Sequence, residues 1–423
     1  MDSKDKIKIK IPADIQHIFK SDPPLSGETN ESQSLSERMV LPALFISRFV
    51  TGIPGIISGL LLIEIGNTFG SSLGVTGQIS TASSIIRVAA ALIMGVLSVR
   101  YSHKSLLTVG LILYFFAALG SGFAMNLGML MLFFTLNGPA FAIVSPMTNT
   151  IVGEHYPEEK RTTIIGWLIA GATLSYVVGA QIIARIAGVG GWRFAFLGFF
   201  LPLSVLGIVS TAFFIPKGSA SQSNGQVISS EIFKAILYHR SAVSCLFVSM
   251  FRMSVDMVIS LYAVSYVRQQ FLISRVFSST VMTIIALSYT VGSLLAGRLV
   301  NRFGRKNIAS FSLGIGAAFI FVFFLSGGLW LALAAVWVGA LFLGVGSSSG
   351  QSLSLEQVPE YRGTMMSLMT AFSGVGSTLG AGLGGYFVLV SNWGTLGIVY
   401  GIMGILGALT LFFFASDPIN DSS

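Results

Sequence analysis

The chain has 423 residues, of which 53% are hydrophobic and only 10% are charged, and its mean hydropathy is +0.80. Soluble domains carry roughly 25% charged residues, so this composition excludes a chain that exposes most of its surface to water. The net charge of +8 does not indicate a nucleic-acid-binding protein, because the basic residues lie in short stretches between apolar runs, as in membrane proteins.

Residues 1–38 form a polar N-terminal segment that begins with several lysines and continues as a Ser/Glu/Asn-rich stretch. It has no apolar core near Met1, so we do not expect a cleaved signal peptide. We expect a disordered cytoplasmic tail, and two roles are open for it. Its lysines can contact anionic lipid, or the tail is simply solvated.

Twelve apolar stretches separated by short polar breaks follow this tail. Each is roughly 20 to 25 residues long, which is enough to cross about 30 Å of hydrocarbon as a helix. A helix satisfies its own backbone hydrogen bonds in lipid and an open strand does not, so we expect an all-α polytopic membrane protein. The expected spans are 40–65, 75–99, 104–125, 127–150, 162–187, 193–215, 241–267, 276–299, 306–327, 329–350, 363–389 and 393–415.

A polar segment at 216–240 divides these spans into two sets of six. Its second part, 231–240, is apolar on one side and charged on the other, which is typical of a helix in the membrane interface. We therefore expect an N-terminal bundle over 39–215, a linker with an interfacial helix, a C-terminal bundle over 241–416 and a short cytoplasmic tail over 417–423.

The distribution of basic residues predicts the orientation. Most of the 25 Lys and Arg residues lie in the N-terminal tail or in connections that follow even-numbered spans. Only Arg185, Arg193, Arg268 and Arg275 lie in the other set of connections. Because cytoplasmic loops are enriched in Lys and Arg, we expect a multi-pass protein of the cell membrane with both termini in the cytoplasm.

The two halves share an internal repeat. Gly95–Lys104 after the second span and Gly297–Lys306 after the eighth both read G-x-L-x-x-R-x-x-x-K, at an offset of 202 residues. Glu154 after the fourth span recurs as Glu356 after the tenth at the same offset. Because the offset contains six spans, the halves enter the membrane in the same direction, and we expect a cavity between them near the midplane.

These loops resemble the signature G-x-x-x-D-R-x-G-R-K of the major facilitator superfamily. The second copy carries it at Gly297, Arg302, Gly304, Arg305 and Lys306, with Asn301 in place of the Asp. The first copy keeps Gly95, Arg100 and Lys104, with Val99 and Ser102 at the positions of the Asp and the second Gly. The resemblance extends over about residues 40–415. It implies twelve transmembrane helices in two pseudo-symmetric six-helix bundles that carry small solutes by alternating access.

Two further segments, Gly191–Phe196 and Pro359–Gly363, resemble the drug/proton-antiporter branch of that superfamily. That branch often has an arginine in span four and a G-x-x-x-G-P-x-x-G-G motif in span five. Here Phe134 stands at the arginine position and Ser175 at the second glycine. The resemblance implies proton-coupled efflux of small organic compounds.

The basic loops have two possible roles. Their charges can lock one state of the transporter through ion pairs and helix ends, or they only set the topology. Asn301 can also cap a helix N-terminus, whereas Val99 cannot. We therefore expect the second copy of the basic loop, Gly297–Lys306, to be more important for function than the first.

Ionisable residues inside the spans are the candidate substrate and coupling residues, because a charge in the membrane costs several kcal/mol and is usually functional. They are Arg48, Arg87, Arg252, Asp256 and Glu64. At the 202-residue offset the first four correspond to Met250, Tyr289, Val50 and Pro54. None of the four is duplicated, so an asymmetric substrate explains them better than the scaffold does.

Arg252 and Asp256 are four residues apart and can pair on one helix face. The pair is either purely structural or contains a titratable Asp256. Arg48 either faces the cavity or extends to the cytoplasmic interface, and Glu64 can be hydrated at the outer interface. Arg87, near the middle of span two, is the strongest candidate for a buried functional cation. If all the arginines face the cavity, its positive charge favours an anionic or zwitterionic solute.

Three functions are therefore considered. The first is a proton-coupled exporter of small organic compounds, and the second is an importer or exchanger of organic anions with the same fold. The third is a receptor or an intramembrane enzyme. The single Cys245, the four histidines outside the spans and the missing G-x-x-x-x-G-K-[ST] loop give no metal site, catalytic set or ATP site. We expect no cofactor, a small-molecule substrate and protons as the coupling ion.

Overall fold

In the computed structural model, the described residues are 30–156, 158–216, 236, 238–358 and 362–417. Their regular secondary structure is helical throughout. The first half contains α1 (Asn30–Leu60), α2 (Leu62–Phe69), α3 (Leu73–Arg100), α4 (His103–Gly122), α5 (Leu127–Thr135), α6 (Asn137–His155), α7 (Glu158–Leu174), η2 (Ser175–Gly179), α8 (Ala180–Ala195), η3 (Phe196–Phe200) and α9 (Leu201–Phe214). The second half contains α11 (Arg240–Phe271), α12 (Arg275–Phe303), α13 (Arg305–Leu325), α14 (Leu329–Glu356), α15 (Arg362–Val390) and α16 (Trp393–Phe414).

The helices make twelve membrane crossings, as expected. Eleven continuous helical segments of the described chain are long and apolar enough to span a membrane, and one of them, Ile164–Phe214, has 51 residues. At 1.5 Å per residue it is more than twice as long as the hydrocarbon core is thick. It breaks at Gly191, where φ is 75° and ψ is 177°. This conformation is open to glycine and strained for other residues, so the segment crosses the membrane twice.

Polar caps define where several spans begin. The side chains of Ser72, Asn126, Ser274 and Asn392 accept hydrogen bonds from backbone N–H groups in the first turns of α3, α5, α12 and α16. These acceptors satisfy donors that have no partner inside the helix. The short polar breaks of the sequence therefore both end one apolar run and start the next helix.

The boundaries of the expected regions differ in one place. Helix α1 begins at Asn30, so residues 30–38 of the expected tail are helical, while the apolar span within α1 begins at Met39. Most of that tail, most of the 216–240 linker with its expected interfacial helix, and residues 418–423 lie outside the described residues.

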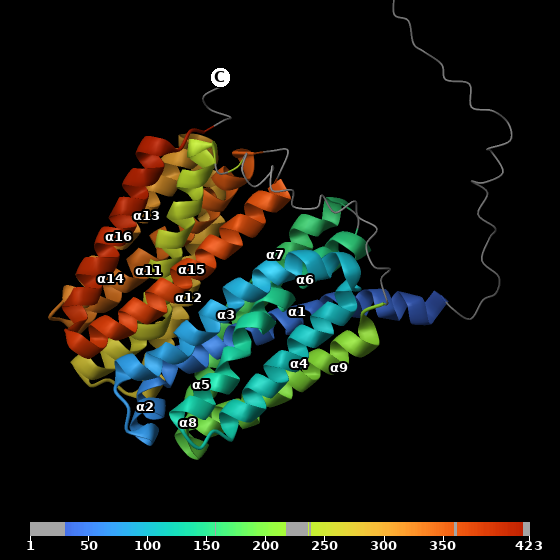
Figure 1. Cartoon of the computed structure of the whole chain (residues 1–423), viewed down its shortest axis with the longest axis horizontal. Coiled ribbons are helices and arrows are strands. Elements are labelled where there is room, and N and C mark those ends of the chain that lie inside the picture. The colour runs from blue at the N-terminus through green and yellow to red at the C-terminus, as the bar shows by residue number, and fades with distance from the viewer. Residues whose placement is uncertain (1–29, 157, 217–235, 237, 359–361, 418–423) are drawn as a thin grey trace, which may run out of the picture.

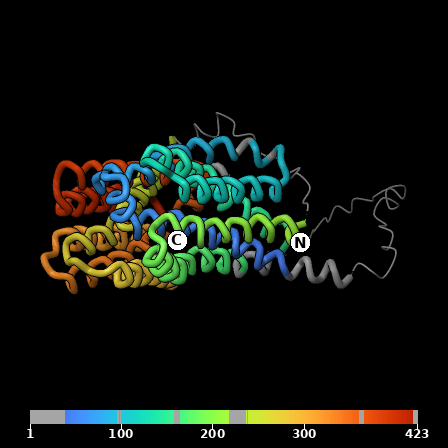
Figure 2. The backbone as a smooth tube through the Cα atoms, turned by 90° about the horizontal axis from the view of Figure 1, so that it is seen from below, coloured from blue at the N-terminus to red at the C-terminus, as the bar shows by residue number. Residues whose placement is uncertain are grey.

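The helices of the two halves form two bundles whose axes are inclined to one another. Figure 1 shows the bundles converging towards α2 and diverging towards the start of α1 and the end of α16, and Figure 2 shows them from a second direction. We call the face with the start of α1 and the end of α16 the terminal face. The face with α2 and the loop between α11 and α12 is the distal face.

The bundles pack against each other through α3 with α15, α1 with α11, and α8 with α12. Gln78 donates to the carbonyl oxygen of Gly382 at 3.2 Å, and Thr290 donates to Thr173 at 3.2 Å. These contacts lie at mid-depth or nearer the distal face. The two bundles therefore meet in the distal half of the molecule.

Candidate functional site

A cavity of about 250 Å³ lies between the bundles. Its wall is formed mainly by α1, α3, α4, α6 and η2 of the first bundle and by α11 of the second. Its lining includes Ser80, Ser83, Ser84, Arg87, Tyr114, Phe134, Asn137, Phe141, Tyr176 and Asp256. The cavity is where the repeat predicts it, at the interface of the two halves.

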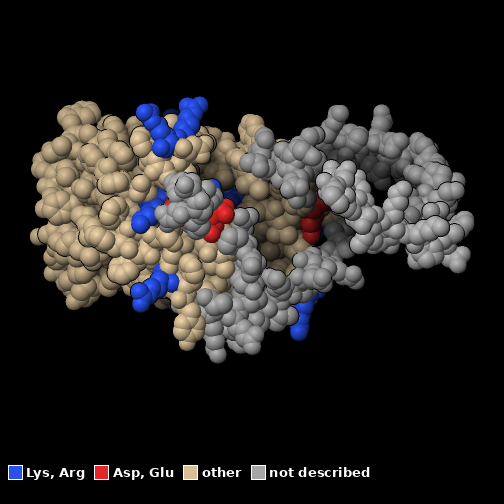
Figure 3. Space-filling view, turned by 90° about the horizontal axis from the view of Figure 1, so that it is seen from above, with Lys and Arg blue, Asp and Glu red and all other residues tan. Residues whose placement is uncertain are grey.

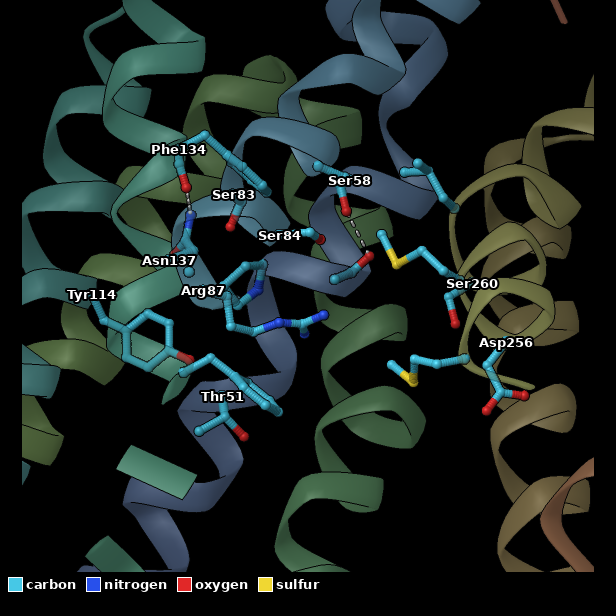
Figure 4. Close-up of a pocket in the computed structure, with 18 of the residues that line it drawn as sticks. Thr51, Ser58, Ser83, Ser84, Arg87, Tyr114, Phe134, Asn137, Asp256 and Ser260 are labelled. Atoms are coloured by element: carbon cyan, nitrogen blue, oxygen red, sulfur yellow. Dashed lines mark hydrogen bonds between the residues drawn. The ribbon is translucent and has the colours of Figure 1, made fainter. Parts of the chain in front are cut away.

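Arg87 lines this cavity on α3, as its position near the middle of the span predicts. Its guanidinium lies over the ring of Phe141, 5.4 Å from the ring centroid. No described residue forms an ion pair or a hydrogen bond with it. Figure 4 shows its side chain extending from α3 into the cavity, with Asp256 on the opposite wall. Arg87 therefore leaves a positive charge on the first bundle's side of the cavity.

Asp256 and Arg252 form the expected pair on α11. Arg252 Nη1 donates to Asp256 Oδ2 at 2.5 Å, and the Arg252 and Asp256 side chains are only 16% and 14% exposed respectively. Tyr289 of α12 joins them, because its hydroxyl accepts from Arg252 at 3.3 Å and donates to Asp256 at 3.4 Å. Asp256 lines the cavity, but Arg252 already compensates its charge, so Arg87 remains the excess charge of the site.

Tyr289 is a member of this site that the sequence pattern did not single out. It occupies the position equivalent to Arg87 at the 202-residue offset. This correspondence could have identified Tyr289 from the sequence, because the repeat places a polar residue at the interface in both halves.

Arg48 does not belong to the cavity lining, contrary to one of its two expected positions. Its Nη1 donates to the hydroxyl of Ser145 on α6 and, at 3.4 Å, to the Ser145 carbonyl oxygen. Arg48 therefore packs α1 against α6, and Arg87 is the arginine of the three that lines this cavity.

Glu64 also lies outside the cavity lining, at the distal face on α2. Arg268 donates to its two carboxylate oxygens at 3.0 and 2.8 Å, and Arg275 Nε donates to Oε1 at 2.7 Å. The Glu64 side chain is only 15% exposed, because the two arginines cover it. These three residues, the distal cluster, join the two bundles across more than 200 residues of sequence. The spacing of residues along the sequence could not predict the contact of Glu64 with these arginines.

The electrostatics of Glu64 follow from this arrangement. Burial by itself raises the pKa of its carboxyl, but the hydrogen bonds and charge of Arg268 and the hydrogen bond of Arg275 outweigh burial. The pKa of Glu64 is therefore below its ordinary value of 4.5, because the charged form is the one that both arginines bind.

The basic loops lie at the terminal face, and Figure 3 shows Lys and Arg side chains there in several separate groups. Lys104 Nζ donates to the carbonyl oxygens of Ala212 and Ile215 at 2.7 and 2.5 Å, at the C-terminal end of α9. Lys306 Nζ lies over the ring of Phe412, 5.7 Å from its centroid. Each of these contacts lies within a single bundle and does not join the two bundles.

The expected capping role of Asn301 is wrong. Asn301 lies inside α12, and the N-cap of α13 is Gly304, with φ at 81° and no capping side chain. Asp417 Oδ2 instead accepts from the backbone N–H groups of Arg305 and Lys306 at 3.0 and 3.5 Å. In the first copy Ser102 caps α4, accepting from Ser105 N at 3.3 Å. The loss of the second glycine there therefore creates a cap.

The remaining loop residues keep their place at the terminal face. Arg100 ends α3 and Arg302 lies in the last turn of α12, with the Arg302 guanidinium 5.2 Å from the centroid of the Phe303 ring. Gly95 and Gly297 lie within α3 and α12, about one turn before these arginines. A basic residue at a helix C-terminus is stabilised by the helix dipole.

The site also contains polar residues that were not predicted from the sequence. Ser80, Ser83, Ser84 and Arg87 follow an i, i+3, i+4, i+7 spacing on α3, and all four line the cavity. This spacing places the four residues on one helix face, and it could have identified them from the sequence. Asn137 could have been identified as a polar residue within an apolar run.

Comparison with known proteins agrees with this architecture. A family model for the Major Facilitator Superfamily matches residues 41–262 and 242–422. The chain belongs to the Major Facilitator Superfamily, a family of membrane transporters rather than enzymes, and it is a multi-pass integral membrane protein.

Relatives and solved structures are more distant. The 4-hydroxybenzoate transporter PcaK of Acinetobacter baylyi is 24% identical over 192 residues, which cover 44% of this chain and 42% of that protein. The alignment thus spans less than half of this relative. The crystal structure of the nucleoside transporter NupG matches with a TM-score of 0.75 and 15% identity, covering 89% of this chain and 100% of that one. A D-xylose-proton symporter matches with a TM-score of 0.73 and 16% identity, covering 90% and 98% respectively. These structures show the fold alone.

Proposed function

We propose that this protein is a secondary transporter of small organic anions. The observation that supports this most is Arg87, a cation in the cavity with no ion pair among the described residues, facing an Asp256 that Arg252 already compensates. A low-dielectric cavity with excess positive charge attracts anions. The PcaK relatives are named for 4-hydroxybenzoate, an organic anion, which agrees with this class.

We propose that transport proceeds by alternating access of the cavity. The bundles meet in the distal half, where the distal cluster joins them. With the termini in the cytoplasm, as the basic residues favour, this arrangement is an inward-facing state. Breaking the distal cluster and closing the terminal face would expose the same cavity to the other side.

Asp256 is the proposed coupling carboxylate. It is the acidic residue of the cavity lining, and its neighbours Arg252 and Tyr289 both bind its charged form. The loop segments resemble the drug/proton-antiporter branch, so we propose that solute leaves the cell in exchange for protons.

A second candidate is import or exchange of the same anions. It uses the same cavity and differs in the direction of coupling. The excess positive charge of the cavity agrees equally with both directions.

Uptake and efflux in proteoliposomes, with a panel of organic anions, cations and neutral solutes and with or without a pH gradient, test these proposals. If the protein is an exporter, anions should accumulate in the acidic compartment, because they move opposite to the protons. If it is an importer, anions should move in the same direction as the protons. The Asp256→Asn variant should still exchange solute but lose its dependence on the gradient. Transport of cations alone would contradict the proposal.

A further inference from the structure

Three residues that line the cavity with Arg87 each have a buried polar side-chain atom with no hydrogen-bond partner among the described residues. The atoms are Ser80 Oγ, Tyr114 OH and Asn137 Oδ1, and their residues are 4%, 0% and 4% exposed. A buried polar group without a partner destabilises a protein by about 1–3 kcal/mol. Buried groups are therefore almost always paired, and each exception needs an explanation.

The orientation of Asn137 is set by a second contact. Its Nδ2 donates to the carbonyl oxygen of Phe134 at 2.7 Å. The reverse orientation would bring two oxygens together, so Oδ1 is the free atom of this amide. An amide oxygen can only accept a hydrogen bond. Whatever pairs with it must bring an O–H or N–H group.

Backbone packing holds Asn137 close to Arg87. At the neighbouring Gly138, a Cβ would lie 2.1 Å from the carbonyl oxygen of Ser83 and 2.9 Å from the backbone nitrogen of Arg87. Only a glycine allows α6 to approach α3 this closely. Figure 4 shows Asn137, Tyr114 and Arg87 on one wall of the cavity, from three different helices.

The residues of this wall therefore combine a cation and an unpaired hydrogen-bond acceptor with two unpaired hydroxyls that can donate or accept. A simple carboxylate would pair with Arg87 and leave Asn137 Oδ1 unpaired. A solute that has both an anionic group and a hydroxyl satisfies both. Aromatic rings of Phe134, Phe141 and Tyr176 also line the cavity. Its volume of about 250 Å³ is slightly below the range of roughly 300–1,000 Å³ for drug-sized ligands.

We infer that the substrate is a small aromatic monocarboxylate that bears a hydroxyl group, with Arg87 binding the carboxylate and Asn137 Oδ1 accepting from the hydroxyl. This inference rests on the proposed function, that the cavity binds organic anions. It adds that a donor group on the ring determines selectivity.

Calorimetric binding to the full-length protein in lipid nanodiscs tests this inference with four ligands: benzoate, 3-hydroxybenzoate, 4-hydroxybenzoate and 4-methoxybenzoate. The methoxy compound keeps the ring oxygen but cannot donate. At least one hydroxybenzoate should bind on the order of 10-fold to 100-fold more tightly than benzoate and 4-methoxybenzoate.

Asn137→Ala should remove this preference, and Arg87→Gln should weaken all four ligands. The matched control is Asn307→Ala, because Asn307 also donates to a backbone carbonyl oxygen, that of Phe303 at 3.2 Å, but is exposed at the terminal face. It should keep the wild-type preference. A ratio between ligands does not depend on the fraction of correctly folded protein, so partial misfolding of Asn137→Ala leaves the test valid.

Equal binding of benzoate and both hydroxybenzoates by the wild type, or a preference that survives in Asn137→Ala, would overturn the inference. If none of the four binds while proteoliposomes carry other organic anions, the inferred substrate class is wrong and the proposed function stands. If no organic anion is carried or bound, both are wrong.

Discussion

Arg268 of α11 donates to both carboxylate oxygens of Glu64 on α2, at 3.0 and 2.8 Å, and so joins the two bundles at the distal face. Such two-point pairing is the strongest geometry between a guanidinium and a carboxylate. Arg268 also donates to the carbonyl oxygen of Leu60 at 3.2 Å. One side chain therefore contacts both the end of α1 and the start of α2, where any separation of the bundles must begin.

Removing the Glu64 charge should open the distal face. Glu64→Gln leaves two partly buried arginines without a carboxylate, and breaking a buried pair in this way costs about 3 kcal/mol, or on the order of 100-fold in the closed-to-open ratio. Spin labels at Met125→Cys and Trp330→Cys, two exposed positions, in a Cys245→Ser background should report a longer distance.

The matched control for that experiment is Glu154→Gln. Glu154 pairs with His103 at 2.5 Å within one bundle, so the same chemical change there should leave the distal distance as in the wild type. An unchanged distance in Glu64→Gln would show that the distal cluster does not hold the bundles together.

Acid should weaken the distal cluster. The pKa of Glu64 in the closed state is below 4.5, so the closed state binds fewer protons than an open state with a free carboxyl. Its stabilising effect is fully present above pH 4.5 and is lost as the pH falls through the lower, closed-state value. The label distance should therefore lengthen only below about pH 4.5 in the wild type and stay independent of pH in Glu64→Gln.

The Arg252–Asp256 pair should show strong coupling between its members. Arg252→Gln leaves a buried carboxylate unpaired, and Asp256→Asn leaves a buried guanidinium unpaired, so each should lower the Tm in detergent by about 5 °C. The double variant should be more stable than the sum of the two losses predicts, by about 1–3 kcal/mol. Simple additivity would show that the side chains do not act as a pair.

Asp417 should stabilise the first turn of α13. Asp417→Asn weakens a charged cap on the N–H groups of Arg305 and Lys306, worth about 1 kcal/mol. Hydrogen exchange at residues 305–308 should become several-fold faster, since 1.4 kcal/mol is tenfold. The first turn of α4, capped by Ser102, is the internal control and should be unchanged.

The membrane spans could be predicted from the sequence because burial in lipid imposes a long apolar run on each helix. The join between the fifth and sixth spans was also visible, as Gly191 lies where the two runs meet. The first residues of the helices were harder to predict from the sequence. Helix α1 begins at Asn30, because polar residues before its apolar span continue the helix outside the membrane.

The site was predictable only where spacing along one helix determines a contact. Arg252 and Asp256 are four residues apart, and their pair follows directly. The partners of Arg48 and Glu64 lie 97 and 204 residues away, and only the packing of different helices brings them together. Capping by Asp417 instead of Asn301 depends in the same way on where the end of the chain returns to the bundle.

Binding and transport of an aromatic carboxylate by Arg87 variants test the central claim most directly. Arg87→Gln removes the excess charge of the cavity, and Arg87→Lys keeps it without the guanidinium geometry. In proteoliposomes, Arg87→Gln should lose on the order of 100-fold in anion transport, while Arg87→Lys keeps a measurable part of it. Anion transport at wild-type rates in Arg87→Gln would contradict the account.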